Sequence, residues 1–393
     1  MYGFITIPTP LIYDLISHPY FQRLRRISQM GLSYLVYPGA HHTRFHHALG
    51  CVHLMQMAVR SLRFKGVAIN DEEAEALYVA ILLHDIGHGP FSHALESNIL
   101  EDISHENISL LFMQRLNTAF KGQLQLAIDI FSGKYPRPFF KQLISSQLDI
   151  DRLDYLKRDS FYTGVTEGNV NNQRLIAMLN VKDDLLVVEE KGIYSVEKFL
   201  LSRRLMYWQV YLHKTSLGAE VLLVNILKRA KWLSMQHRLT QVHNKLDYFV
   251  KEPKALSSKP EKALDYYAQL DDNDVVSALK KWIEHEDKVL SRLCEMLINR
   301  KLLHIKMHQE VIGPKKLQKK ISVCCEQWSL NEEEAAYFVP TGSIYNKAYD
   351  QDMPIFILKK NGKLKEIAAF SDHSVLKTLA QPVIKHFIGF PKF

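Results

Sequence analysis

The sequence contains few cysteines, no long apolar run, no internal repeat and no low-complexity segment. Its four cysteines include no CxxC pair, and neighbours such as Cys324 and Cys325 seldom form a framework disulfide, so we expect free thiols in a reducing cytoplasm. No stretch approaches the roughly 20 apolar residues that a membrane span needs. The N-terminal segment lacks a basic n-region, and Pro8 and Pro10 interrupt its apolar stretch, which argues against a secretory signal. These absences predict a cytoplasmic globular protein with no membrane partner.

The composition is that of an ordinary globular protein, with 47% hydrophobic and 23% charged residues. A chain of 393 residues has room for two or three domains. The net charge of +8 and the pI near 9.0 favour polyanionic partners, which include nucleotides, phosphates and nucleic acid. Charge alone does not choose among these partners.

Histidine is unevenly distributed along the chain. Ten of the eighteen histidines lie in the first 105 residues, namely His18, His41, His42, His46, His47, His53, His84, His88, His93 and His105. Such crowding of a scarce residue type favours a metal or phosphate site. Each of these histidines, taken singly, is more often an ordinary surface or core residue.

The stretch ILLHDIGHGPFSH, residues 81–93, is the centre of the sequence pattern. An apolar run from Ala76 to Leu83 brings His84 and Asp85, side by side, to what should be the mouth of a buried site. Two glycines and a proline follow within five residues and end any helix there. An imidazole next to a carboxylate can bind a divalent metal if the chain bends at this point.

Two further residues are candidates for the same metal site. His47 begins an apolar-striped helix expected over residues 48–62 and can face the His84 and Asp85 pair from that helix. Asp151 lies among apolar residues, where an ionised carboxylate is rarely buried unless it is paired or bound to metal. The alternative, an ordinary exposed acidic face, suits the nearby Asp149 and Asp154 better.

The remaining first half reads as helices. Residues 11–31 predict a helix restarted at Pro19, whose arginines at positions 23, 25 and 26 form either a solvated face or a phosphate contact. Asn70 with Glu73 predicts a capping box for the helix that ends at His84. A further helix is expected to open at His105.

Beyond residue 180 the pattern predicts a short hairpin over 185–194 with Gly192 in its turn. A long helix over 196–233 follows, with Arg203, Tyr207, Tyr211 and Lys214 on one face. Tyrosines at helical spacing are more often part of a core than of a ligand site.

The chain is expected to divide into a helical domain, residues 1–300, and a C-terminal α+β module, residues 301–393. Residues 251–260 resemble a linker, and residues 356–370 predict a β-hairpin with a type I′ turn at Asn361-Gly362. Short strands are expected at 336–338 and 344–345. The predicted fold class is mainly α, with a short β-hairpin insertion in the helical core.

Four blocks in order, FQRLRRISQMG, PGAHHTRFHHALG, HDIGHGPFSH and DIDRLDYLKRD, resemble the HD-domain phosphohydrolases. Within them the chain is similar to the dNTP triphosphohydrolases related to the vertebrate enzyme that joins a sterile alpha motif to an HD domain. The resemblance extends through SRRLMYWQVYLHK and covers roughly residues 10–220. It implies a helical HD-domain core that hydrolyses a dNTP to deoxynucleoside and triphosphate.

The resemblance also implies the roles of individual residues. The metal ligands would be His47, His84, Asp85 and Asp151, holding Mg²⁺, Mn²⁺, Fe²⁺ or Zn²⁺. His93 would be the general acid at the 5′ oxygen, tuned by Glu96 and His105. Phosphate contacts would come from Arg44, His88, Arg152 and Arg203, and contacts around the sugar from Gln29, Tyr155, Asp159, Tyr207 and Tyr211.

The chain departs from the family pattern at His46, Glu96 and Arg152, which are tolerable changes, and at two positions that bear on function. Tyr207 stands where the vertebrate enzyme has a histidine in its sugar site. Ser17 stands where regulated members have an aspartate that reads an activating guanine nucleotide, so such activation is not assumed. The alternatives to a dNTPase are an HD-type phosphohydrolase or phosphodiesterase acting on another nucleotide, and a nucleic-acid-binding protein that has lost turnover. A homo-oligomer, dimer or tetramer, is also expected.

Overall fold

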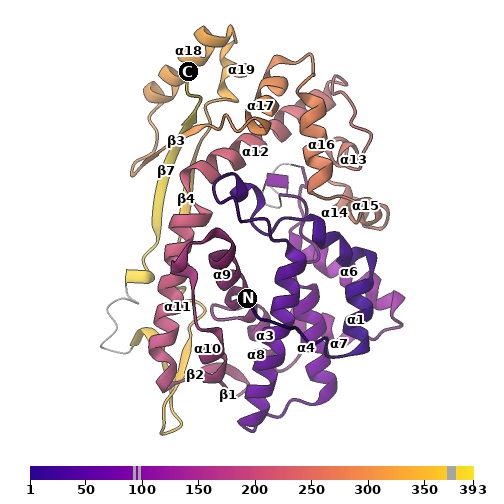
Figure 1. Cartoon of the computed structure of the whole chain (residues 1–393), viewed down its shortest axis with the longest axis vertical. Coiled ribbons are helices and arrows are strands. Elements are labelled where there is room, and N and C mark those ends of the chain that lie inside the picture. The colour runs from indigo at the N-terminus through magenta and orange to yellow at the C-terminus, as the bar shows by residue number, and fades with distance from the viewer. Residues whose placement is uncertain (92–93, 96–98, 370–377) are drawn as a thin grey trace.

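The computed structural model describes residues 1–91, 94–95, 99–369 and 378–393. It is elongated and mainly helical, with α16 (Asp272–Trp282) to α19 (Glu332–Ala336) at one end and the hairpin of β1 (Leu179–Lys182) and β2 (Leu185–Glu189) at the other (Figure 1). The strand β7 (Val383–Phe390) runs lengthwise along one side. The predicted fold class, a helical HD-type core with a β-hairpin and a small C-terminal sheet, is confirmed.

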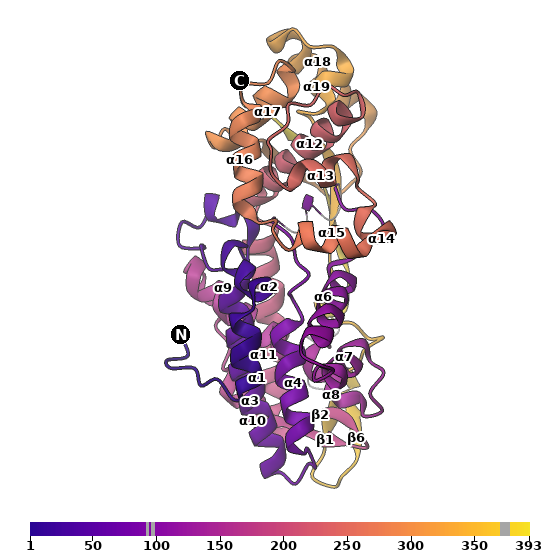
Figure 2. The same ribbon diagram turned by 90° about the vertical axis from the view of Figure 1, so that its right-hand side faces the viewer.

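The elements of the first half surround the candidate site. They are α1 (Pro10–Ser17), α2 (Pro19–Gln22), η1 (Arg23–Arg26), η2 (Gly31–Leu35), α3 (Arg44–Phe64), α4 (Asp71–Leu83), α6 (His105–Ala119), α7 (Gln125–Ser132), α8 (Pro138–Ile144), α9 (Ile150–Thr163), η3 (Thr166–Gly168) and α10 (Asn172–Met178). Figure 2 shows α1, α3 and α4 in the same half of the molecule. Their apolar faces form one continuous core with the later helices.

The second half contains η4 (Glu190–Gly192), α11 (Ile193–Met206), the π-helical segment η5 (Tyr207–Tyr211), α12 (Lys214–Met235), α13 (Leu246–Lys251), α14 (Ala255–Ser258), α15 (Pro260–Tyr267), α16, α17 (Lys288–Ile298), α18 (Pro314–Trp328), α19 and η6 (Ile367–Ala369). The expected linker at 251–260 is wrong, because α14 lies within it and buries Ala255 and Leu256. No helix among the described residues is long and apolar enough to cross a membrane.

Polar caps fix the ends of the helices that carry the candidate ligands. The capping box of α4 is confirmed: Asn70 Oδ1 accepts from Glu73 N at 2.8 Å, and Glu73 Oε2 accepts from Asn70 N at 2.8 Å. At the start of α9, Asp149 Oδ1 accepts from Arg152 N at 2.7 Å. Because a capped end fixes where a helix begins, these contacts fix the position of Asp151 and the path of α4.

The N-terminal helix is interrupted as predicted, since α1 ends at Ser17 and α2 begins at Pro19. Both expectations for the arginines are wrong at Arg23, which is fully buried. Its guanidinium donates to Ile86 O and His88 O, each at 2.9 Å, and to Leu270 O at 3.1 Å. A buried cation with three carbonyl acceptors holds the backbone together rather than meeting solvent or phosphate.

The first hairpin joins β1 (Leu179–Lys182) to β2 (Leu185–Glu189), with Asp183 and Asp184 in its turn. Both aspartates have left-handed backbones, with φ of 54° and 55°. The predicted turn at Gly192 is therefore wrong. That glycine lies in η4, where a Cβ would come within 2.7 Å of Val188 Cγ1, so its small size serves packing.

The strands form two sheets. The first has the order β1-β2-β5-β6, in which β5 (Phe356–Leu358) pairs parallel with β2 and antiparallel with β6 (Leu364–Glu366). The second has the order β3-β7-β4, with β3 (His304–His308) and β4 (Thr341–Asn346) both antiparallel to β7. Strands from both sides of residue 301 therefore share the first sheet.

The C-terminal predictions had mixed outcomes. The hairpin at 356–366 and the strand at 344–345 are confirmed. The predicted type I′ turn is wrong, because it needs positive φ at both central residues and only Gly362 of the pair has it, at 79°. The strand expected at 336–338 is also wrong, since α19 extends to Ala336 and a turn follows.

Candidate metal centre and adjoining cavity

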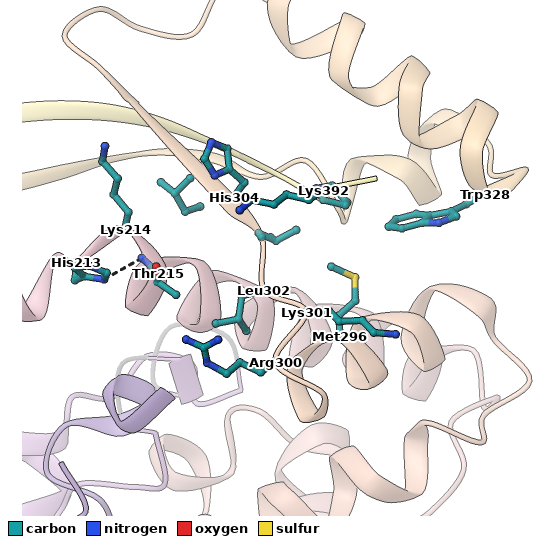
Figure 3. A pocket seen from close by; sticks show the side chains of 13 residues that line it. His213, Lys214, Thr215, Met296, Arg300, Lys301, Leu302, His304, Trp328 and Lys392 are labelled. Carbon is teal, nitrogen blue, oxygen red and sulfur yellow. Dashed lines mark hydrogen bonds between the residues drawn. The ribbon is translucent and has the colours of Figure 1, made fainter. Parts of the chain in front are cut away.

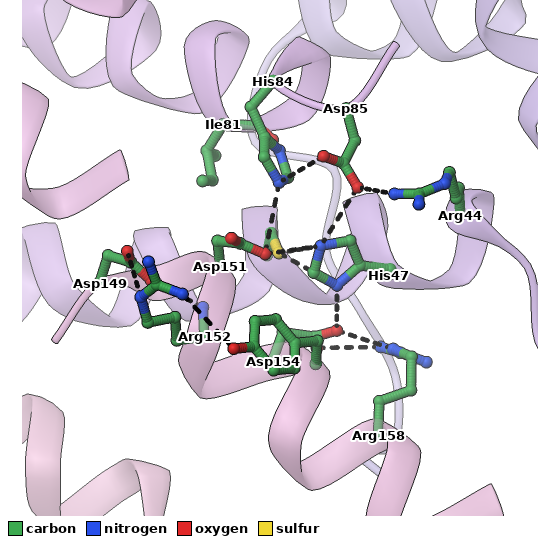
Figure 4. A network of polar contacts seen from close by, with 12 residues as sticks. Arg44, His47, Ile81, His84, Asp85, Asp149, Asp151, Arg152, Asp154 and Arg158 are labelled. Atoms are coloured by element: carbon green, nitrogen blue, oxygen red, sulfur yellow. Dashed lines mark hydrogen bonds and ion pairs between the residues drawn. The ribbon is translucent and has the colours of Figure 1, made fainter. Parts of the chain in front are cut away.

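The four residues assigned as metal ligands come together from three separate segments (Figure 4). His47 lies in the first turns of α3, His84 and Asp85 directly follow α4, and Asp151 lies in the first turn of α9. His47 Nε2 is 3.1 Å from Asp151 Oδ1 and 3.8 Å from Asp85 Oδ2. His84 Nε2 is 3.6 Å from Asp151 Oδ1 and 3.4 Å from Asp85 Oδ1. Two imidazoles and two carboxylates thus share one small volume.

The other nitrogen of each imidazole is already bonded. His84 Nδ1 donates to Ile81 O at 2.7 Å, because a carbonyl can only accept. His47 Nδ1 lies 2.8 Å from Asp154 Oδ2, and Asp154 in turn accepts from Arg158 Nε at 2.7 Å. Both rings therefore direct Nε2 at the shared volume. A carboxylate or carbonyl bonded to the other ring nitrogen holds a metal-binding histidine in this orientation.

These residues fit a divalent cation. His84 Nε2 is buried and makes no hydrogen bond within the described residues. Its lone pair faces oxygens of Asp85 and Asp151, and a lone pair facing carboxylates is unfavourable unless a cation or a proton lies among them. The mixture of imidazole and carboxylate donors suits Mg²⁺, Mn²⁺, Fe²⁺ or Zn²⁺.

Asp85 is held in its ionised form. Burial alone would raise the pKa of its carboxyl, but His84, His88 and Arg44 hold that pKa well below the ordinary value. Arg44 Nη1 lies 2.5 Å from Asp85 Oδ2, and His88 Nε2 lies 3.4 Å from Asp85 Oδ1. An anionic carboxylate is the form that a metal ion binds.

Cys51, one turn beyond His47 on α3, is a neighbour that the sequence did not suggest. Its Sγ and one donor atom each of His47, His84 and Asp151 all lie within 4.8 Å of one another. Sγ is 3.6 Å from both ring nitrogens of His47, so it packs beside the imidazole. Burial raises the pKa of this thiol, and a metal binds the thiolate form, so Cys51 is not assigned as a ligand.

A cavity of about 570 Å³ opens onto the cluster. Most of the predicted site residues line it: Gln29, Arg44, Asp85, His88, His105, Asp151, Arg152, Tyr155, Asp159, Tyr207 and Tyr211. Of the other described site residues, His47, His84 and Arg203 do not line it. His93 and Glu96 lie outside the described residues. The size is that of a small-molecule site, and its lining combines cations, carboxylates and aromatic rings.

One wall of the cavity is built from tyrosines and a bonded carboxylate. Tyr211 Oη donates to Asp159 Oδ2 at 2.8 Å, and His42 Nε2 lies 2.7 Å from Asp159 Oδ1. The Tyr207 and Tyr211 rings are 5.2 Å apart and edge-on. The sequence offered His42 only as one of several histidines, yet it fixes the carboxylate that positions Tyr211.

The helix expected over 196–233 is broken at this wall. After α11 the chain widens into the π-helical η5, where Leu212 N bonds Tyr207 O at 2.7 Å, and α12 begins only at Lys214. π-Helical segments are frequent at functional sites. The break separates Tyr207 and Tyr211, which line the cavity, from Lys214, which lies elsewhere.

The loop after α4 is held from behind by residues that the sequence did not assign. Ser109 Oγ donates to His84 O at 2.8 Å and accepts from Gly87 N at 2.9 Å. Tyr267 Oη donates to Gly87 O at 2.9 Å, alongside the Arg23 contacts described above. A Cβ on Gly87 would lie 2.2 Å from His105 O, so only glycine fits there.

The expectation that Asp149 and Asp154 form an exposed acidic face is wrong, because both side chains are buried. Asp149 caps α9, and Asp154 holds His47. The burial argument that selected Asp151 applied equally to Asp154, which lies between Leu153 and Tyr155 in the sequence.

A second cavity, of about 640 Å³, lies at the start of α12 (Figure 3). Its lining includes His213, Lys214, Arg300, Lys301, His304 and Lys392. No candidate metal ligand belongs to this lining. Part of the positive charge of the chain is therefore gathered at a place distinct from the His/Asp cluster.

Comparison with known families agrees with this site. The family model of the HD domain matches residues 44–159, and that of the HD associated region matches residues 170–241. The chain belongs to the HD-domain family. A crystal structure of a phosphohydrolase from Bacteroides thetaiotaomicron is 49% identical, with a TM-score of 0.95, and the match covers 99% of this chain and 98% of that one. Fold, His/Asp cluster and this likeness together define an HD-domain phosphohydrolase with a divalent-metal site.

Two curated relatives differ in how much of their length is matched. YwfO of Bacillus subtilis is 33% identical over 390 residues, covering 94% of this chain and 86% of that protein. The deoxynucleoside triphosphate triphosphohydrolase SAMHD1 homolog of Dictyostelium discoideum is 29% identical over 249 residues, covering 58% of this chain and 48% of that protein. The chain thus matches about half the length of the relative whose name states a substrate.

Proposed function

We propose that this protein is a metal-dependent dNTP triphosphohydrolase, which converts dNTP and water to deoxynucleoside and triphosphate. The observation that carries the proposal is the continuity of one cavity, from the His/Asp cluster past Arg44 and Arg152 to the tyrosine wall. A triphosphate needs the cations, and a nucleoside suits the aromatic wall. The distant likeness to a relative named as a dNTPase supports the same substrate class.

The phosphate end of the proposed complex would use the cations near Asp85. A bound divalent ion supplies a polarised phosphoryl oxygen and a water of lowered pKa. Arg44 would turn from its present partner Asp85 toward phosphate oxygens, and Arg152 is held at the cavity by Ser146 O at 2.7 Å. The stacked rings of His88 and His105, with centroids 3.9 Å apart, would complete the phosphate-binding end of the cavity.

The sugar end would use the tyrosine wall. Tyr211 is tied to Asp159, so its ring cannot move aside easily, and a 2′-hydroxyl would crowd against it. Gln29 and Tyr155 would contact the 3′-hydroxyl. The proposal therefore favours a deoxyribonucleotide over a ribonucleotide.

Product chromatography tests this function directly. Purified protein is incubated with each dNTP and with Mg²⁺, Mn²⁺, Fe²⁺ or Zn²⁺, and the expected products are deoxynucleoside and tripolyphosphate. Inorganic phosphate or pyrophosphate in place of tripolyphosphate would contradict the proposed bond cleavage. The same panel, extended to ribonucleotides, monophosphates and phosphodiesters, would reveal another HD-type substrate.

The variant Asp151→Asn ties turnover to the metal site. A neutral amide of nearly the same shape replaces an anionic ligand, so metal content and turnover should fall together. Asp14→Asn is the control, because Asp14 is exposed on α1. Retention of metal and full activity by Asp151→Asn would show that this carboxylate is not a ligand.

The proposed homo-oligomer is checked on the same samples by light scattering.

A further inference from the structure

The cavity has an end that the proposed catalysis leaves unused. The candidate ligand Asp151 lies in the first turn of α9, and Asp159 lies eight residues further along the same helix, about 12 Å away at the rise of an α-helix. Beyond Asp159 and its partner Tyr211, the lining comes from Leu212, from the segment 30–33 and from α12. Since α12 packs against η2, the lining residues of α12 and of the segment 30–33 come from neighbouring elements, and none of them is an assigned metal ligand.

Glu220 on α12 lies in this wall. Apart from Ser33, the other residues that line this end are apolar or glycine, namely Met30, Gly31, Leu32, Leu212 and Leu223. Within the described residues, its carboxylate makes no hydrogen bond or ion pair. Burial raises the pKa of Glu220 to about 7, and no neighbouring cation contributes to the shift. An ionised carboxylate is unfavourable in a largely apolar wall, and this one faces a cavity. We therefore expect a ligand to supply hydrogen-bond donors to it.

Gln29, in the same lining, gives a second and independent indication of a ligand. Its Oε1 is buried and accepts no hydrogen bond within the described residues, while its backbone N donates to His42 O at 3.0 Å. The backbone of Gln29 is therefore fixed, and its side-chain amide oxygen can accept a hydrogen bond from a ligand, for example from a sugar hydroxyl. With Gln29 at the sugar, Glu220 is the lining carboxylate left for the base, because Asp159 is bonded to Tyr211 and His42, and Asp85 and Asp151 are assigned to the metal.

We propose that Glu220 accepts hydrogen bonds from the edge of the nucleobase and makes the pocket prefer guanine, an inference that rests on the proposed dNTPase function. Guanine presents N1–H and N2–H₂ side by side, and a carboxylate can accept from both. Adenine and cytosine each place a ring acceptor next to their amino group, and thymine places carbonyl oxygens on both sides of its single N–H. Only guanine offers two adjacent donors to the two oxygens of Glu220.

The test measures kcat/KM for the four dNTPs with the wild-type protein and with Glu220→Gln. The wild type should prefer dGTP over dATP, and Glu220→Gln should lower kcat/KM for dGTP by about 10- to 100-fold while changing dATP by only a few-fold. Glu284→Gln, an exposed position, is the control and should leave all four values unchanged. No preference for dGTP in the wild type, or an equal loss for all four substrates in Glu220→Gln, would overturn the proposal.

Deoxyinosine triphosphate tests the same contact without any variant. It keeps N1–H but lacks the 2-amino group, so the wild type should handle it less well than dGTP. Equal kcat/KM for the two nucleotides would contradict a bidentate contact.

Binding separates this inference from the proposed function. If the protein turns over no dNTP with any metal, the dNTPase proposal fails, and equilibrium dialysis with dGTP and dATP then decides the role of Glu220. Tighter dGTP binding that is lost in Glu220→Gln would support base recognition, and equal affinities would refute it.

Discussion

Replacing Asp154 by asparagine isolates the contribution of the carboxylate behind His47. Asp154 is fully buried, lies 2.8 Å from His47 Nδ1, and accepts from Arg158 Nε at 2.7 Å and Nη2 at 3.0 Å. Despite burial, which alone raises the pKa of this carboxyl, His47 and Arg158 lower it, so the side chain is an anion. Asparagine keeps the shape but loses the charge and turns an N–H₂ group toward one of these donors.

Two effects of different size follow from that geometry. A carboxylate behind a metal-binding histidine typically contributes about 10- to 100-fold in metal affinity, which is about 1.4–2.7 kcal/mol. Leaving Arg158 buried without its anion costs about 3 kcal/mol of stability, at the low end for a broken buried ion pair because one hydrogen bond survives. The Asp154→Asn protein should therefore bind metal less tightly and should also melt earlier without metal.

The two effects are measured separately. Metal is removed with a chelator, and calorimetric titration with Mn²⁺ then gives the affinity, while melting in excess chelator gives the stability of the metal-free protein. Asp14→Asn again serves as the control. A variant that melts earlier but binds Mn²⁺ as tightly as the wild type would refute the reasoning, because Asp154 would then support only the fold.

Three further changes test other parts of the site. Gly50→Ala should destabilise the protein by about 1–3 kcal/mol and weaken metal binding, since its Cβ would lie 2.1 Å from Asp154 Oδ1 and 2.2 Å from Arg158 Nη2; melting and Mn²⁺ titration measure both. His93→Ala should keep its metal and lose about 10²- to 10⁴-fold in kcat if His93 is the general acid, whereas normal kcat per folded molecule would refute that role. The pKa of Glu220 rises from 4.5 to about 7 on folding, so the native state binds its proton more tightly and stability falls as pH rises through that window. Urea unfolding should therefore show Glu220→Gln gaining about 1–2 kcal/mol over the wild type at pH 8 relative to pH 5, after allowing for partial exposure in the cavity.

The local sequence was sufficient for the helices that carry the cluster. The capping box at Asn70 and the glycines after Asp85 are signals within a few residues, and the structure has α4 and its ending where they indicated. The four assigned ligands depended also on the family resemblance, and the structure places Nε2 of each histidine 3.1–3.8 Å from an oxygen of each aspartate. Short-range pattern and family motif thus identified the centre of the site.

The residues that support the centre could not be found in this way. Arg23 was expected in a solvated face or at a phosphate, but it donates to Leu270 O, which is 247 positions away in the chain. Whether a charged side chain is buried depends on such distant partners, and no local pattern encodes them. The same reason hid the role of Asp154, whose partner His47 is 107 positions away.

The parallel pairing of β2 with β5 was equally hidden. The hairpin at 356–366 has a clear local signal, but nothing near it states which sheet it will join. Parallel pairing is set by tertiary contacts rather than by a turn between the two strands. The prediction of the elements was therefore better than the prediction of their neighbours.

The contacts that β5 and the residues just before it make with the first half of the chain determine the order in which the protein can mature during synthesis. Gln147 Nε2 donates to Asp350 O at 2.6 Å and also to Met353 O, and Gln147 lies only four positions before Asp151. A nascent chain that has emerged up to residue 300 has every assigned ligand, but the segment that holds the start of α9 is still to be made. Until then the edge of β2 that pairs with β5 is open to other chains, which is an aggregation hazard. We expect metal loading to follow release from the ribosome rather than to accompany translation.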